Sequence, residues 1–169
     1  MQRVRAAFVD VAGKPVGAIG PGLAVLLGVG PADRATDGER LAAKIASLRI
    51  FDDAQGRFHH TVGETGGSIL VVPQFTLYGD IRRGRRPDFT RAAPPDQGER
   101  LYQGFCGALR GAGLTVATGQ FGAQMQVRID ADGPVTIVAS TDGWAEGDLG
   151  RGRDGGTASP SRARAPWRG

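Results

Sequence analysis

Two short segments carry the residue types in this chain that are best suited to chemistry. The first, 73–77, ends an apolar run over 68–72 and places two polar side chains, Gln74 and Thr76, at the end of a strand. The second, 132–136, is a Gly-Pro step that enters another apolar run. An X-Pro bond becomes cis for only about 0.5–1 kcal/mol, and a preceding glycine lets a ligand approach the backbone closely. The first segment therefore offers hydrogen-bond donors, and the second offers two rigidly aimed backbone carbonyls.

The side chains usually found in catalytic triads and metal sites give no persuasive constellation. His59 and His60 are adjacent in a turn-like stretch without cysteine or acidic residues at metal-ligand spacing, so they are interpreted as surface residues. The single cysteine, Cys106, belongs to an apolar helical face and is interpreted as a packing residue. A nucleophilic Thr76 would need a neighbouring base. None is evident, so a positioning role is preferred for Thr76.

Length and composition fit one globular domain. The 169 residues are 22% charged and 40% hydrophobic, and no apolar run reaches the roughly 20 residues of a membrane helix. One cysteine cannot form an intrachain disulfide, and the first residues lack the pattern of an export signal, so a cytoplasmic location is expected. The net charge of +4 is too small to establish nucleic-acid binding by itself.

The elements that must position the two segments are strands and two helices. Thr36 is expected to cap a helix over 37–48, and paired prolines introduce a second helix over about 96–110. Residues 50–67 are expected to be irregular. Strands are predicted over 2–9, 14–19, 22–29, 68–77, 114–118, 124–130 and 134–140. This pattern predicts a compact domain of the α/β class with α+β character, in which mostly antiparallel strands pack against the two helices.

The composition changes near the C-terminal end. From residue 141 onward Gly, Arg, Ser, Pro and Asp dominate, and too few apolar side chains remain to offset the entropy of ordering. The sequence therefore predicts a domain over 1–140 followed by a disordered tail over 141–169. Its five arginines leave open either an affinity for RNA or a merely solvated extension.

The two segments, with several blocks between them, resemble the D-aminoacyl-tRNA deacylases of the bacterial D-Tyr-tRNA deacylase type. The family signatures Ser-Gln-Phe-Thr-Leu and Asn-x-Gly-Pro-Val-Thr match with two departures, Pro73 and Ala131. Further matches in the same order are Gln2-Arg3-Val4, Leu48-Arg49-Ile50-Phe51, Gly66-Gly67, Arg85-x-Pro87-x-Phe89 and Thr118-Gly119-x-Phe121-Gly122-Ala123-x-Met125. The resemblance covers residues 2–138.

The resemblance implies a barrel-like sheet with two main helices, and an enzyme without metal or cofactor. Its reaction would be hydrolysis of the ester that joins a D-amino acid, or misattached glycine, to the 3′ acceptor end of tRNA. It also implies a cytoplasmic homodimer in which the Gly-cisPro loop of one subunit enters the active site of the other.

The resemblance also assigns roles to single residues. The backbone N–H groups of Phe75 and Thr76, helped by Gln74, would face the developing oxyanion. The carbonyls of Gly133 and Pro134 would bind the substrate ammonium and exclude L side chains.

Three further groups of residues complete the expected site. Arg3 would brace the Gly-Pro loop. Phe121 and Met125 would line the pocket of the terminal adenosine or else pack in the core. The arginines of the 82–86 loop would contact tRNA phosphates or else be solvated; they are Arg82, Arg83, Arg85 and Arg86.

The two departures leave more than one function open. Pro73 lacks the hydroxyl and the backbone N–H of the serine it replaces. Ala131 lacks the tolerance of asparagine for left-handed backbone, at a cost of about 1–2 kcal/mol if that conformation is required, unless Asp130 or Asp132 compensates. The candidates are a D-aminoacyl-tRNA deacylase, a paralogue that removes another mischarged residue, and a non-catalytic dimer that binds tRNA ends.

Overall fold

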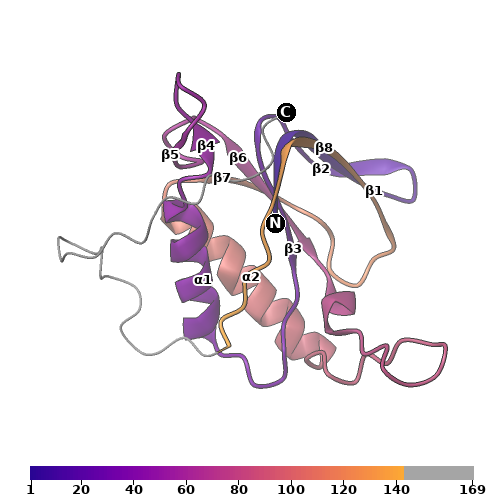
Figure 1. Ribbon diagram of the computed structural model, residues 1–169. Coiled ribbons are helices and arrows are strands. Elements are labelled where there is room, and N and C mark those ends of the chain that lie inside the picture. Colours follow the sequence, from indigo (N-terminus) through magenta and orange to yellow (C-terminus); the bar gives the residue numbers. More distant parts are fainter. Residues whose placement is uncertain (143–169) are drawn as a thin grey trace.

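A computed structural model describes residues 1–142 (Figure 1). The tail predicted over 141–169 therefore lies outside the described residues from position 143 onward. No helix among residues 1–142 is long and apolar enough to cross a lipid bilayer.

One mixed sheet forms the centre of the molecule, in the strand order β2-β1-β3-β6-β7, with β8 on the other edge of β1. Its strands are β1 (Gln2–Val11), β2 (Lys14–Ile19), β3 (Gly22–Leu27), β6 (Ser68–Pro73), β7 (Thr115–Thr118) and β8 (Met125–Thr136). β1 is antiparallel to β2, β3 and β8, whereas β3–β6 and β6–β7 are parallel pairs. Antiparallel pairs thus outnumber parallel ones, as predicted, but the centre of the sheet is parallel.

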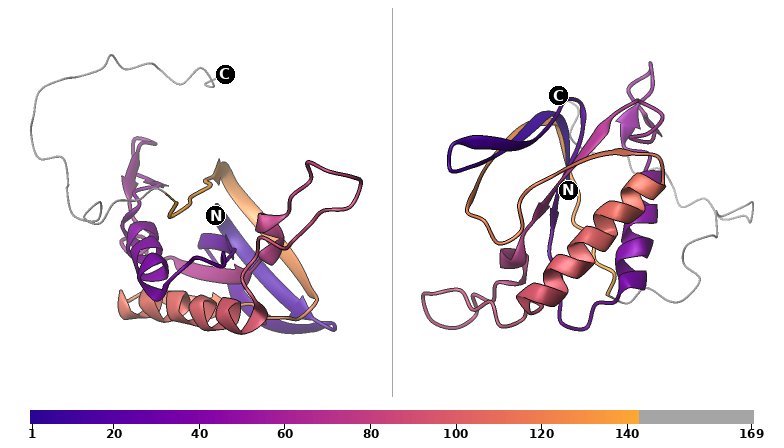
Figure 2. Two further views of the ribbon diagram at one scale, coloured as in Figure 1. Left: turned by 90° about the horizontal axis from the view of Figure 1, so that it is seen from below. Right: turned by 180° about the vertical axis from the view of Figure 1, so that it is seen from behind.

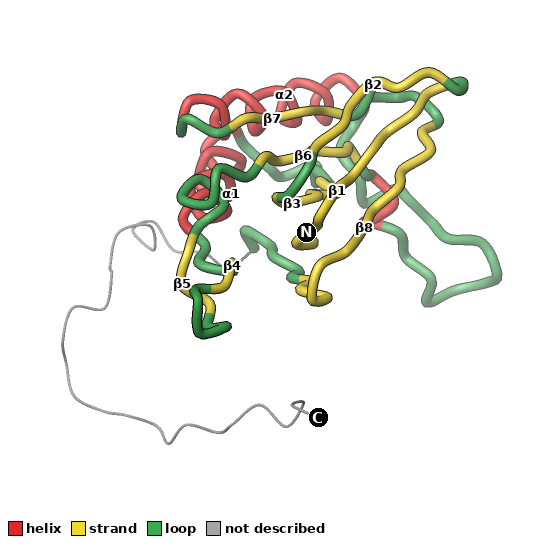
Figure 3. Tube along the Cα trace, turned by 90° about the horizontal axis from the view of Figure 1, so that it is seen from above, coloured by secondary structure: helices red, strands yellow, loops and turns green. Residues whose placement is uncertain are grey.

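The sheet is nearly closed on itself. The N-terminal end of β1 pairs with β3 and its C-terminal half with β2, while β8 pairs with the opposite edge of β1. Figure 3 shows the resulting bend, in which β1, β2 and β8 run obliquely to β6 and β7. This is the barrel-like sheet expected from the sequence.

Two buried clusters fill the two faces of the central strands. Side chains alternate across a strand, so Leu23 and Ile69 face one side and Leu70 faces the other. The first side is covered by α1 (Ala35–Ser47) and α2 (Pro95–Gly111), which lie together on one face of the sheet (Figures 1 and 2). The second side is covered by β1, β2 and β8. β3 and β6 are therefore buried on both faces, as their continuous apolar runs predict.

Some predicted boundaries are wrong, each for a local reason. Thr36 does not cap the first helix, because that helix starts at Ala35 and the backbone N–H of Arg34 donates to Asp37 Oδ2 at 2.9 Å. The strand predicted over 22–29 ends at Leu27. The second helix matches its prediction to within one residue at each end.

Three other segments differ from their predictions. The strand predicted over 68–77 ends at Pro73 and continues into a 3₁₀ helix, η1 (Phe75–Tyr78). The strands predicted over 124–130 and 134–140 are one strand, β8, which continues through the Gly-Pro step. The irregular stretch contains a small hairpin formed by β4 (Phe51–Asp52) and β5 (Phe58–His60).

Candidate functional site

The strand-end segment, residues 73–77, presents polar groups where β6 ends. The N–H of Gln74 donates to the Leu27 carbonyl at 2.8 Å, which fixes the turn into η1. The first N–H groups of any helix have no partner within it, so those of Phe75 and Thr76 are available at this end. The Gln74 amide donates to the Thr76 hydroxyl, and the side chains of Phe75 and Thr76 are exposed. The segment thus ends β6 with exposed polar groups next to a helix start.

Pro73 removes no hydrogen bond from the sheet. Residues of a parallel strand bond alternately to the neighbours on either side. The Val71 carbonyl accepts from the Gly119 N–H on the β7 side, and Gln74 bonds to β3, so the nitrogen of Pro73 faces the β7 side. The pairing of β6 with β7 ends at Val71 and Thr118. Proline is tolerated at such a position because no ladder partner is lost.

We expect the Pro73→Ser variant to be slightly less stable than the natural chain. The substitution restores an N–H that has no ladder partner and returns conformational freedom to the unfolded chain, so the free energy of unfolding falls by about 0.4–1 kcal/mol. Urea unfolding followed by circular dichroism measures this change. An increase of the same size would show that a serine N–H completes a hydrogen bond here.

Gly133 and Pro134 lie in a bulge of β8. Gln2 pairs with Thr136 and Val4 with Ala131, so the four residues 132–135 face the single residue Arg3. We call these four residues the Gly-Pro bulge. The Gly133–Pro134 peptide bond is cis, as the sequence suggested, and Gly133 has a φ of +112°. Both residues are exposed, and bulges of this kind often re-aim groups beside active sites.

The departure at Ala131 causes no backbone strain. Among the non-glycine residues of 1–142 only Ala12 has a positive φ, so position 131 does not need the left-handed conformation that asparagine tolerates. Asp132, next in the chain, binds the guanidinium of Arg3, with 2.9 Å between Oδ2 and Nε. Arg3 therefore contacts the bulge, as expected for a brace.

The two signature segments do not meet within one protomer. The Gly-Pro bulge lies beside Arg3, which pairs with Leu23 near the start of β3, whereas Pro73 pairs with Leu27 at the end of β3. Four residues of strand span about 13 Å, and the width of the intervening strands adds to this distance. The two segments therefore occupy separate places within a single chain.

Phe121 and Met125 lie near the strand-end segment and are half-buried. The Phe121 ring is 6.1 Å from that of Tyr102, whose hydroxyl donates to the Val71 carbonyl at 2.9 Å. Burial raises the pKa of Tyr102, so this hydroxyl stays protonated and acts as a donor. A β-carbon on Gly119 would lie 2.8 Å from the Met125 sulfur and 3.3 Å from Pro73 Cδ. The Met125 side chain is thus placed beside Pro73.

The arginine loop, residues 82–86, projects from the body of the protein (Figure 2). Its base is closed by a pair of backbone hydrogen bonds between Asp80 and Asp88. The Arg82 side chain donates to Asp80, with Nε–Oδ1 at 2.8 Å, and this hydrogen bond lowers the pKa of Asp80 to about 2. The remaining arginines of the loop are exposed and form no ion pair with any residue of 1–142; they are Arg83, Arg85 and Arg86.

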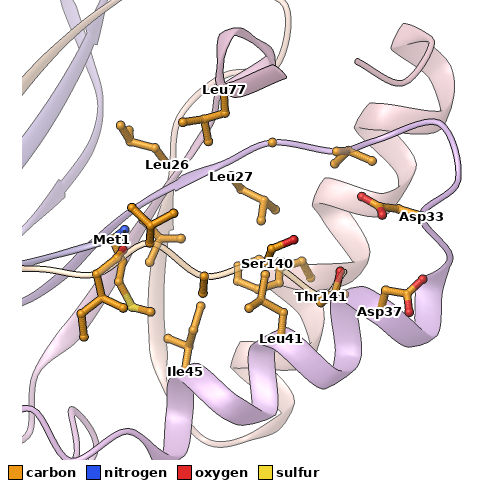
Figure 4. A pocket seen from close by; sticks show the side chains of 18 of the residues that line it. Met1, Leu26, Leu27, Asp33, Asp37, Leu41, Ile45, Leu77, Ser140 and Thr141 are labelled. Atoms are coloured by element: carbon orange, nitrogen blue, oxygen red, sulfur yellow. Dashed lines mark hydrogen bonds between the residues drawn. The ribbon is translucent and has the colours of Figure 1, made fainter. Parts of the chain in front are cut away.

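A cavity of about 440 Å³ lies between β3, α1 and residues 136–142. It exists because β1 pairs with β3 only as far as Ala24, which leaves the next residues of that β3 edge without a neighbour. Figure 4 shows Met1 at one end of the cavity and Asp33 with Asp37 at the other. Leu77 and Tyr78 line it, but none of the predicted site residues does. The cavity is thus next to the strand-end segment without including it.

Known proteins resemble this chain across the described domain. Residues 1–140 match the family described as D-Tyr-tRNA(Tyr) deacylase. A protein of Heliobacterium modesticaldum named D-aminoacyl-tRNA deacylase is 56% identical over 138 residues, which are 82% of this chain and 92% of that protein. A protein of the same name from Symbiobacterium thermophilum is 51% identical over 142 residues, 84% of this chain and 94% of that protein.

Solved structures share the fold. One described as c-Myc DNA unwinding element binding protein is 42% identical, with a TM-score of 0.75 over 82% of this chain and 95% of that one. Another, described as a probable eukaryotic D-amino acid tRNA deacylase, is 20% identical, with a TM-score of 0.70 over 79% of this chain and 92% of that one. The second likeness concerns the fold alone.

Proposed function

Because the chain belongs to the D-Tyr-tRNA(Tyr) deacylase family, we propose that it is a hydrolase that removes D-amino acids, and misattached glycine, from the 3′ end of tRNA. The observation that carries this proposal is the 56% identity over 138 residues, a range that includes both signature segments. We assign the activity to residues 1–140 and expect it in the cytoplasm.

The strand-end segment supplies the electrostatic part of the proposed reaction. Water adds to the ester carbonyl, the bond to the ribose oxygen breaks, and the free amino acid and tRNA leave. The N–H groups of Phe75 and Thr76 donate to the developing oxyanion, and each such donor typically lowers the barrier by about 3 kcal/mol. Gln74 orients the Thr76 hydroxyl through their hydrogen bond. The neighbouring ribose hydroxyl of the substrate assists the water, because the described residues offer no base beside Thr76.

The Gly-Pro bulge supplies the stereochemical part. The carbonyls of Gly133 and Pro134 accept hydrogen bonds from the substrate ammonium, and their backbone collides with an L side chain but admits a D side chain or glycine. The bulge is exposed and lies far from Thr76 in its own protomer. We therefore infer a homodimer in which each subunit inserts its bulge into the site of the other.

The tRNA end is recognised by two further groups. Phe121 and Met125, beside Pro73, form the wall against which the terminal adenosine packs. Arg83, Arg85 and Arg86 contact phosphates, since guanidinium groups match phosphate oxygens and these three are not committed to an acidic partner among the described residues. Arg82 contributes less, because Asp80 already binds it.

A deacylation assay with D-Tyr-, L-Tyr-, Gly- and L-Ala-tRNA tests the proposal. We expect turnover of the D-Tyr and Gly charges and none of the two L charges. Turnover of L-Ala-tRNA would instead identify a paralogue of different specificity. Binding of tRNA without any hydrolysis would identify a non-catalytic protein.

A further inference from the structure

Arg3 is the one charged side chain among residues 1–142 that is buried, with 7% of its surface exposed. A buried guanidinium is stable only when several partners compensate its charge. The partners of Arg3 come from two places that are far apart in the sequence, the Gly-Pro bulge and the β4–β5 hairpin.

Each nitrogen of the guanidinium contacts a different one of these partners. Nε lies 2.9 Å from Asp132 Oδ2 in the bulge, although its N–H is not aligned for a hydrogen bond. Nη2 lies 3.4 Å from the point where a β-carbon on Gly133 would stand. Nη1 points the other way and donates to the Ile50 carbonyl at 2.9 Å and to Asp52 Oδ2 at 3.0 Å. Because the guanidinium is planar and rigid, a shift of one partner moves the contacts of the others.

The β4–β5 hairpin carries Asp52 and places an aromatic ring next to Arg3. The ring of Phe58, which pairs with Asp52 across the hairpin, lies 5.8 Å from Arg3 Cζ and covers the guanidinium. The turn is closed by Asp53, whose carboxylate accepts from the backbone and side-chain N–H groups of Arg57 at 3.0 Å each. Asp53 therefore stabilises the hairpin without contacting Arg3, whereas Asp52 connects the hairpin to it.

We propose that Asp52 is a positioning residue for stereochemical selection, because it fixes the orientation in which Arg3 supports Gly133. This inference rests on the proposed function of the Gly-Pro bulge. Without the Asp52 carboxylate, Asp132 is the one acidic partner left to the guanidinium, which shifts toward it, and Nη2 leaves the backbone of Gly133. The wall that rejects L side chains then becomes looser, whereas the oxyanion donors on β6 are unaffected.

The Asp52→Asn variant tests this role, with kcat/KM measured for D-Tyr-tRNA and, at enzyme concentrations high enough to detect hydrolysis far slower than the standard assay resolves, for L-Tyr-tRNA. We expect the preference for the D substrate to fall by about tenfold, because contacts within one ionic network typically couple to this extent. Asp52→Glu, which restores the carboxylate, should recover most of the preference. Asp53→Asn is the matched control and should leave the preference unchanged, although it loosens the turn. Phe58→Leu removes the aromatic ring that covers the Arg3 guanidinium without altering charge. It should lower the preference for the D substrate by a smaller factor.

An unchanged D-to-L ratio in Asp52→Asn, with the variant folded, would overturn the inference, and so would an equal change in Asp53→Asn. Should Asp52→Asn fail to fold, the ratio in Phe58→Leu decides in the same way. The proposed function fails separately, when the natural chain itself does not hydrolyse D-Tyr-tRNA.

Discussion

Gly133→Ala is expected to lower the hydrolysis of D-Tyr-tRNA by at least about 100-fold while the protein remains folded. The new β-carbon would lie 2.9 Å from Val135 Cγ2 and 3.0 Å from the Val135 nitrogen, and a φ of +112° is rarely adopted by L side chains. The backbone of the bulge must therefore move. A misplacement of about 1 Å at a substrate-positioning group costs rates of this order. Single-turnover deacylation measures the loss.

Gly66→Ala is the matched control for this substitution. Gly66 also has a positive φ, +66°, but no atom lies within 4 Å of the added β-carbon, and the residue belongs to neither signature segment. Its variant should keep the natural rate. A Gly133→Ala protein that hydrolyses D-Tyr-tRNA within a factor of about three of the natural rate would contradict the role given to the bulge.

Gly22→Ala is expected to have the largest effect on stability, lowering the free energy of unfolding by about 3 kcal/mol or more. A β-carbon at this position would lie 1.8 Å from the Ser68 carbonyl oxygen and 2.7 Å from the Ser68 nitrogen. Gly22 starts β3 and pairs with both β1 and β6, so no flexible side chain can yield to the added atom. The central pair of strands has to separate locally. Urea unfolding gives the change.

Gly20→Ala, two residues earlier, provides the comparison. No atom lies within 4 Å of its added β-carbon, so its unfolding free energy should stay within about 0.5 kcal/mol of the natural value. A similarly small change in Gly22→Ala would mean that β3 and β6 are less closely paired than described.

The sequence predicts well those helices and strands whose pattern involves only residues close together in the chain. The apolar runs of β3 and β6 indicate their burial on both faces, and the paired prolines place the start of α2 to within one residue. The sequence does not predict the β4–β5 hairpin, because its strands have only two and three residues and because Arg3, which contacts it, is distant in sequence. The Gly-Pro step was interpreted as a boundary between strands, whereas β1 pairs with β8 on both sides of it.

In the candidate site, too, local features could be predicted from the sequence, whereas contacts between residues distant in sequence could not. The donors of the strand-end segment and the Gly-Pro bulge could be identified from their residue types and spacing. The role of Asp52 could not, because only the folded chain brings it to Arg3. The consequence of Pro73 also required the structure, since the end of β7 decides whether an N–H at this position would have a ladder partner.

The pairing of β1 with β8 has a consequence for synthesis. Among the described strands, β1 leaves the ribosome first and β8 last, and the two pair along nearly the full length of β1. The nascent chain therefore exposes one edge of β1 until the domain is almost complete, and such unpaired edges favour aggregation. Arg3 also lacks its ionic partner Asp132 until that stage of synthesis. A product that terminates before Met125 lacks β8 altogether, so this edge of β1 stays unpaired and the product is expected to aggregate.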